Sequence, residues 1–196
     1  MLTVGVLALQ GAFAKHIEML LSLNVHAIEV RKPQDLDLCD ALIIPGGEST
    51  TMTRQMHFIK LNDKLKEFGS KKPIFGTCAG LILMSKDILE SEMKSFGLID
   101  IKVLRNAFGR QADSFTTEIA LHLNTKKPSL FPAIFIRAPR IQECGKEVEV
   151  LASFEGEPVL VKQGHHLAAT FHPELTKDPS IHRYFLSIIE TNKKVK

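Results

Sequence analysis

A single cysteine between two glycines most constrains what this chain can fold into. A short apolar run at residues 73–75 ends at Gly76, Cys78 follows, and an apolar helical pattern begins directly after it. The spacing Gly-x-Cys-x-Gly, closed by Gly80, is that of the nucleophile elbow, a turn between a strand and a helix so tight that a large side chain at either flank would clash. In such a turn Cys78 lies where free helix N–H groups favour a thiolate. Because cysteine is also often a small buried hydrophobe, this stretch alone leaves a nucleophile and a core cysteine equally open.

The pattern around this turn predicts a parallel sheet. Strands are expected at residues 3–9, 25–30, 41–44 and 73–75, with helices at 14–23 and 50–68 between them. The first helix has Ile17, Leu20 and Leu21 on its expected core face. Strand and helix alternation of this kind gives parallel pairing through βαβ units.

The second half of the chain has a different pattern, with short strands and turns that suit hairpins. These strands are expected at residues 99–104, 114–121, 133–136, 148–154, 158–161 and 167–170, before a last helix at 179–190. We therefore predict an α/β fold of three layers, with a mostly parallel sheet flanked by helices and an antiparallel extension in the C-terminal half. Residues 1–191 are expected to form a single domain and residues 192–196 a basic tail.

Charge and cysteine content narrow the function classes. The net charge of +3 is accounted for by Lys193, Lys194 and Lys196, so there is no basic stripe for a nucleic acid. The apolar runs are too short to span a bilayer, and the first residues do not resemble a signal peptide. Three widely spaced cysteines have no zinc-binding pattern and suit a reducing compartment. We expect a cytoplasmic protein without a metal.

His172 is the best candidate for a base that would serve Cys78. An apolar strand ends in His172-Pro173-Glu174, and functional groups of parallel sheets gather beyond the carboxyl ends of strands. Glu174 can curl back to accept a hydrogen bond from the imidazole and so fix its tautomer. The other histidines have weaker cases: His16 and His182 are expected to be surface or packing residues of helices, and His165 and His166 to lie in a solvated turn.

Paired glycines follow the strand at residues 41–44. Gly46 and Gly47 lack a Cβ, so backbone N–H groups of this loop can point at a ligand. The loop lacks the spacing and the lysine of a phosphate-binding loop. An oxyanion hole made by the Gly46 or Gly47 amide and the Ala79 amide fits better, although an ordinary turn is the alternative.

Taken together and in this order, the loop at 45–47, the elbow at 76–80 and the segment 171–174 resemble a class I glutamine amidotransferase. The resemblance implies Cys78 as nucleophile, His172 as general base and acid, and Glu174 as the residue that orients His172. Further matches resemble the family of glutaminase subunits of pyridoxal 5′-phosphate synthase, and they lie at residues 7–11, 45–52, 105–111, 135–139, 170–175 and 182–185.

This narrower resemblance also implies a substrate site and a partner. L-Glutamine would be bound by Gly46, Gly47, Glu48, Arg105, Ile136 and Arg137. A guanidinium suits the α-carboxylate of an amino acid; without the resemblance, Arg105 and Arg137 would be taken for ion pairs at a strand edge. Gln10 and Gly11 would face the partner, while Arg110 and Gln111 are left unassigned.

The implied partner is a (β/α)₈-barrel synthase that receives ammonia and makes pyridoxal 5′-phosphate from ribose 5-phosphate and glyceraldehyde 3-phosphate. Pyridoxal phosphate is then a product of the complex, and no cofactor is expected on this chain. Three alternatives stay open: a glutaminase that feeds another ammonia acceptor, an unrelated cysteine hydrolase on an α/β sheet, and a non-catalytic binding subunit.

Overall fold

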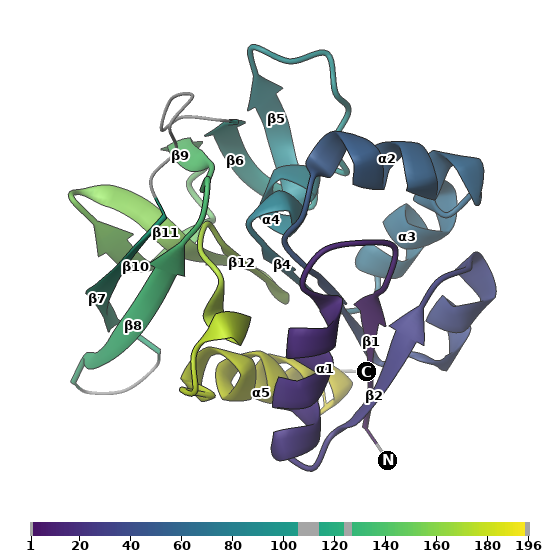
Figure 1. Cartoon of the computed structure of the whole chain (residues 1–196), viewed down its shortest axis with the longest axis horizontal. Helices are drawn as coiled ribbons and strands as arrows, with labels where there is room; N and C mark the ends of the chain where they lie inside the picture. The colour runs from purple at the N-terminus through teal and green to yellow at the C-terminus, as the bar shows by residue number, and fades with distance from the viewer. Residues whose placement is uncertain (1, 106–113, 124–126, 195–196) are drawn as a thin grey trace.

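The chain folds around a seven-stranded sheet whose central strands are parallel (Figure 1). The structure is a computed structural model, which describes residues 2–105, 114–123 and 127–194. The strand order is β10-β11-β12-β4-β3-β1-β2; β12, β4, β3, β1 and β2 run parallel, whereas β10 and β11 are antiparallel. The strands are β1 (Thr3–Leu7), β2 (His26–Val30), β3 (Ala41–Ile44), β4 (Ile74–Thr77), β10 (Glu149–Phe154), β11 (Glu157–Gln163) and β12 (His166–Ala169). The predicted α/β architecture and its antiparallel extension are confirmed.

Helices cover both faces of this sheet, which explains the continuous apolar sequence of its central strands. Along β3, Ala41 and Ile43 belong to one buried cluster, and Leu42 and Ile44 to the other. One face is covered by α1 (Phe13–Ser22) and α5 (Ser180–Lys194), and the other by α2 (Ser49–Phe58), α3 (Asn62–Gly69) and α4 (Ala79–Met84). A short 3-10 helix, η1 (Pro33–Leu38), precedes β3. In the described part of the chain, no helix combines the length and apolarity needed to cross a membrane.

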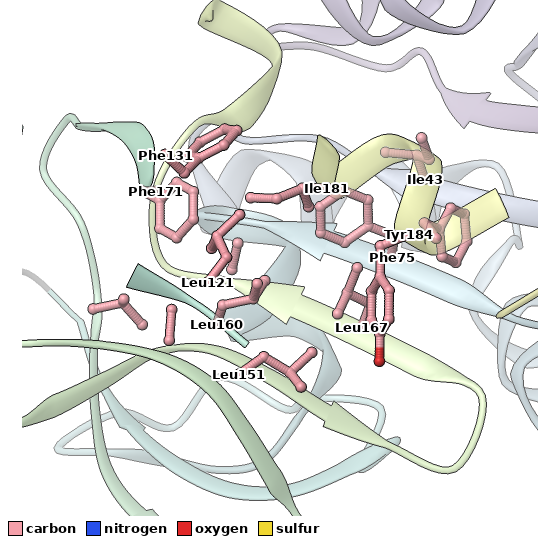
Figure 2. Packing of buried hydrophobic residues seen from close by; sticks show 14 of the residues in the cluster. Ile43, Phe75, Leu121, Phe131, Leu151, Leu160, Leu167, Phe171, Ile181 and Tyr184 are labelled. Atoms are coloured by element: carbon pink, nitrogen blue, oxygen red, sulfur yellow. The ribbon is translucent and has the colours of Figure 1, made fainter. Parts of the chain in front are cut away.

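A hairpin of β7 (Phe115–Leu121) and β8 (Ser129–Phe135) extends the first of these clusters. Figure 2 shows Phe131 of this hairpin beside Phe171, and Phe75 of β4 near Tyr184 of α5. The rings of Phe131 and Phe171 have centroids 5.9 Å apart. This packing fixes the segment directly before His172.

A separate three-stranded sheet consists of β5 (Ser85–Leu89), β6 (Ile99–Leu104) and β9 (Arg140–Cys144). Sequence patterning predicted β6 but neither β5 nor β9. Both are short, and β5 follows α4 directly, so its residues look like a continuation of the helix. The sheet places Arg105, the residue after β6, at the rim of the site described below.

Three local expectations were wrong. The helix expected over 50–68 is two helices, because Lys60 adopts a φ of 56° between α2 and α3. Leu21 is 57% exposed, and the buried residues of α1 are His16 and Leu20. His166 is buried rather than solvated, and its Nδ1 accepts a hydrogen bond from the backbone of Ile74.

Candidate functional site

Cys78 occupies a strained turn between β4 and α4. The strand ends one residue before it, the helix begins one residue after it, and the cysteine itself has φ 49° and ψ −104°. A positive φ is uncommon for a residue with a Cβ, and strained backbone conformations cluster at active sites, ligand clamps and switch regions. A Cβ on Gly80 would lie 2.0 Å from the carbonyl oxygen of Ile44, and one on Gly76 would lie 2.6 Å from the carbonyl carbon of Gly80. The predicted clash at both flanks is confirmed.

His172 and Glu174 lie just beyond the carboxyl end of β12. His172 precedes the 3-10 helix η2 (Pro173–Leu175), and its backbone N–H donates to the carbonyl oxygen of Ile134 in β8 at 2.9 Å. The Nδ1 atom of its ring is 2.7 Å from Oε1 of Glu174, so the predicted contact is present. The carboxylate holds the proton on Nδ1, which leaves Nε2 as the ring nitrogen available for proton transfer.

The Cys78 side chain acts on the same imidazole and favours its protonated form. Burial lowers the pKa of His172, but the hydrogen bonds and charges of Cys78 and Glu174 outweigh it and raise the pKa to about 10. Burial also raises the pKa of Glu174, yet the neighbouring imidazoles of His16 and His172 bring it below its ordinary value. The site thus favours a protonated imidazole beside an ionised carboxylate.

The glycine loop after β3 lies against these side chains. A Cβ on Gly46 would fall 2.3 Å from Cε1 of His172 and 3.3 Å from the Cβ of Cys78, so a larger residue would displace both. The N–H of Gly46 donates to Oγ1 of Thr77 at 3.1 Å. That hydrogen bond occupies one of the amides that the sequence suggested for an oxyanion hole.

A second loop, at residues 10–12, holds the glycine loop from outside. Nε2 of Gln10 donates to the carbonyl oxygen of Glu48 at 2.7 Å, and the N–H of Ala12 donates to that of Gly46 at 3.3 Å. Gly11 has a φ of 82°, and a Cβ there would lie 1.9 Å from the Gly46 oxygen. Any partner that moves this loop would therefore also move the glycine loop.

Glu48 is the N-cap of α2, a role that the sequence analysis did not assign. Its carboxylate accepts hydrogen bonds from the backbone N–H and the hydroxyl of both Thr50 and Thr51. Burial raises the pKa of Glu48, but these hydrogen bonds dominate and lower it to about 2. Nη2 of Arg105 lies 4.0 Å from the same carboxylate, and Nη1 donates a long hydrogen bond to Oγ of Ser91 at 3.5 Å.

The end of β8 forms the opposite wall. The carbonyl oxygen of Ile136 lies 3.9 Å from Sγ of Cys78, and the next residue, Arg137, has a φ of 44°. Two sharp, positive-φ turns thus meet at this site, one at the cysteine and one at the arginine. Such backbone strain persists only where the surrounding structure enforces it.

These elements enclose a pocket of about 260 Å³, close to the lower end of the range for small-ligand sites. All six predicted glutamine contacts line the pocket, together with the predicted catalytic residues Cys78 and His172. The third predicted catalytic residue, Glu174, lies behind His172 and does not line it. Of the two residues predicted to face the partner, only Gly11 contributes to the wall. The lining residues are Gly11, Ala12, Gly46, Gly47, Glu48, Ser49, Cys78, Ala79, Ile82, Arg105, Ile136, Arg137, His172 and Leu175.

Three polar residues around the site were missed. Thr77 bonds the glycine loop, and His16 and His182 lie buried behind Glu174. A signal for His16 exists in its spacing of four from Leu20, which puts both on the buried face of α1. Arg110 and Gln111, left unassigned from the sequence, lie outside the described residues. Within the described ranges, no group of three or more His, Cys, Asp or Glu side chains could hold a metal ion.

Comparisons with known proteins place this geometry in a family. The model of the SNO glutamine amidotransferase family matches residues 6–191. The chain is 50% identical over 188 residues to "Pyridoxal 5'-phosphate synthase subunit PdxT" of Thermotoga neapolitana, covering 95% of this chain and 99% of that protein. It is 48% identical over 191 residues to the protein of the same name from Desulforudis audaxviator, covering 97% and 100%.

A solved structure described as a glutamine amidotransferase superposes with a TM-score of 0.88 at 44% identity, covering 95% of this chain and 98% of that one. The resemblance seen in the sequence motifs is therefore confirmed. The chain belongs to the SNO glutamine amidotransferase family.

Proposed function

We propose that this chain is the glutaminase subunit of a pyridoxal 5′-phosphate synthase, which hydrolyses L-glutamine to L-glutamate and ammonia and passes the ammonia to a partner synthase. The observation that carries the proposal is the meeting of Cys78, His172 and Glu174 beside one pocket, although the histidine lies 94 positions after the cysteine in the sequence. Relatives about 50% identical over nearly the whole chain carry the name of that subunit.

The pocket offers complementary groups to each end of glutamine. The side-chain amide carbon lies next to Sγ of Cys78, while the α-carboxylate is bound by the guanidinium groups of Arg105 and Arg137. Ile136 contributes its backbone, and Glu48 supplies negative charge for the α-ammonium. Because the Glu48 carboxylate is engaged at the start of α2, its position is fixed before substrate arrives.

The reaction proceeds through a covalent thioester. The Cys78 thiolate, stabilised by the imidazolium of His172, attacks the amide carbon of glutamine. The oxygen of the tetrahedral intermediate is stabilised by the amides of Gly47 and Ala79, each worth about 3 kcal/mol. The Gly46 amide holds Thr77 instead, so the role of Gly46 is to leave room for His172.

Proton transfer then releases ammonia. His172 gives its Nε2 proton to the leaving nitrogen, the C–N bond breaks, and a γ-glutamyl thioester is left on Cys78. The neutral imidazole next takes a proton from water, whose hydroxide attacks the thioester and frees glutamate and the thiolate. Glu174 holds the imidazole in the required tautomer throughout and stabilises its positive charge.

The partner is a (β/α)₈-barrel synthase subunit, and both act in the cytoplasm. Gln10 and Gly11 face it, and they touch the glycine loop directly. Ammonia in open solvent is protonated and lost as a nucleophile, so the partner must cover the pocket and receive ammonia through a protected path. Contact at residues 10–12 would at the same time adjust the loop that stabilises the oxyanion.

The test is glutamate release from L-glutamine by the full chain, with and without the synthase subunit. Cys78→Ala should abolish glutamine-dependent synthesis of pyridoxal phosphate, while added ammonium salt should restore synthesis by the complex. Retained glutamine use by this variant, or no glutamate release by the wild-type complex, would overturn the proposal.

A further inference from the structure

A second layer of histidines lies behind Glu174, away from the pocket. Nε2 of His16, on α1, is 3.4 Å from Oε2 of Glu174, the oxygen that His172 does not use. On its other side, Nδ1 of His16 is 3.0 Å from Nε2 of His182, on α5. Both histidines and the Glu174 side chain are fully buried. The mechanism above uses neither histidine.

The hydrogen-bonding atoms select one tautomer for each ring. Nδ1 of His182 has no hydrogen-bond partner in the described part of the chain, and a buried N–H without a partner is much rarer than an unused lone pair. The proton of His182 therefore lies on Nε2 and is donated to Nδ1 of His16. That assignment puts the His16 proton on Nε2, which lies 3.2 Å from Oγ1 of Thr77 and 3.4 Å from Oε2 of Glu174. Oε2 has no hydrogen bond of its own among the described residues, so His16 acts on it through this close electrostatic contact.

The opposite tautomers would leave two faults in the core. His182 would carry a buried Nδ1–H with no acceptor, and a lone pair of His16 would face the negatively charged Oε2 of Glu174. Both cost free energy because a buried polar group without a partner loses its hydration and gains nothing. The donors thus point in one direction, from His182 to His16 and from His16 toward Thr77 and Glu174.

We propose that His16 is a positioning residue that, held in one tautomer by His182, places its polar Nε2–H beside the second oxygen of Glu174 and so keeps the carboxylate aligned with His172. This inference rests on the proposed function of Cys78, His172 and Glu174. It adds two residues, from the first and last helices, to the machinery that sets the protonation of the imidazole.

The neutral state of the two rings suits this role. Burial lowers the pKa of His16; the charge of Glu174 acts in the opposite direction, and His172 lowers this pKa further. Burial, together with the nearby His16, lowers the pKa of His182 to about 3. The groups that face His16 are Glu174 and His172 from the site, His182 from α5 and Thr77 from β4. A neutral N–H donor orients the carboxylate while leaving its full charge to His172, whereas an imidazolium at His16 would compete for that charge.

The experiment compares variants at residue 16 with a matched variant elsewhere. His16→Leu removes the donor; His16→Gln keeps an N–H close to the position of Nε2. His166→Leu is the control, because His166 is also buried and neutral but bonds the backbone of Ile74, outside the pocket. A second pair, His182→Leu and His182→Gln, serves if His16→Leu does not fold.

Two readouts separate positioning from general destabilisation. One is glutamine hydrolysis by the full chain with its synthase subunit. The other needs no glutamine: the pH dependence of Cys78 alkylation by iodoacetamide, measured on the Cys78 peptide and with Cys78→Ala as the blank. Alkylation reports the thiolate–imidazolium pair, so it tests the role of His16 even if glutamine is not the substrate. A wild-type complex that releases no glutamate would count against the proposed function and not against this role of His16.

For His16→Leu we expect kcat to fall about tenfold with little change in KM, and the half-maximal pH of alkylation to rise by about one unit. His16→Gln should restore most of the kcat and most of the wild-type alkylation profile. His166→Leu should change neither kcat nor the alkylation profile. The two His182 variants should follow the same order with smaller effects. An unchanged alkylation profile in the leucine variants, the same shift in His166→Leu, or no restoration by glutamine would each overturn the proposal.

Discussion

The backbone N–H of Gly46 donates to Oγ1 of Thr77 at 3.1 Å, joining the glycine loop to the residue before Cys78. Thr77 is fully buried, and its hydroxyl also lies 3.2 Å from Nε2 of His16. One hydroxyl therefore contacts both the glycine loop and the histidine behind Glu174. Thr77 thus links the glycine loop on one side of the pocket to His16, which lies behind Glu174.

Replacing Thr77 with valine should weaken both stability and catalysis. The variant keeps the shape of the side chain but leaves the buried Gly46 N–H without an acceptor, which costs about 1–3 kcal/mol. Urea unfolding should show a loss of that size, and glutamine hydrolysis should fall about tenfold because the loop is no longer fixed. Thr77→Ser, which keeps the hydroxyl, is the control; equal losses in serine and valine variants would contradict the assignment.

The elbow predicts a contrast between two glycines. In Gly80→Ala the new methyl group meets the backbone of Ile44, which cannot move aside as a side chain can, so we expect a loss of about 3 kcal/mol. Gly97 has a positive φ but open space around it, and Gly97→Ala should cost only about 1 kcal/mol. Thermal and urea unfolding of the two variants would check this order, and a more harmful Gly97 substitution would contradict it.

The sequence predicted those parts of the molecule that local patterns encode. The parallel strands, the elbow and the His172–Glu174 contact each depend on a few neighbouring residues, and each was predicted correctly. The engaged amide of Gly46 could not be foreseen, because it depends on how β3 and β4 align. His16 and His182 are 166 residues apart and meet only because α1 and α5 cover the same face of the sheet. Contacts of this kind have no local signature.

Glu48 should contribute to stability as a helix cap. Glu48→Ala removes the acceptor for the first amides of α2, and the loss of an N-cap costs about 1 kcal/mol. The pKa of Glu48 is lowered from 4.5 to about 2, so its contribution is present above pH 4.5 and is lost as the pH falls through 2. Unfolding midpoints of the wild type and Glu48→Ala should therefore converge in acid; a constant difference would argue against the cap.

Arg105 and Arg137 should act on substrate affinity. If their guanidinium groups bind the α-carboxylate, Arg105→Leu and Arg137→Leu should raise KM for glutamine at least about tenfold and lower kcat much less. Alkylation of Cys78 by iodoacetamide, which has no α-carboxylate, should be unaffected in both variants. Arg31→Leu is a suitable control, because Arg31 pairs with Glu29 at the end of β2. A loss of kcat at unchanged KM would place the two arginines in the chemical step instead.

The raised pKa of His172 gives the folded chain a distinct pH dependence. His172 has an ordinary pKa of 6.5 and a folded pKa of about 10, so the folded state binds the proton more tightly than the unfolded state does. The stabilisation is fully present below about pH 6.5 and is lost as the pH rises through 10. Glu174→Gln keeps the shape of the side chain but removes the charge that favours the imidazolium, so the stability of this variant should change less across this pH range.

Urea unfolding from about pH 6.5 to about pH 10 would measure how the unfolding free energy of the wild type and of Glu174→Gln depends on pH, with Glu190→Gln on the exposed side of α5 as the control. Because Cys78 also contributes to the raised pKa, the slope should shrink rather than vanish, and a slope equal to that of the wild type would show that Glu174 does not hold the proton on His172.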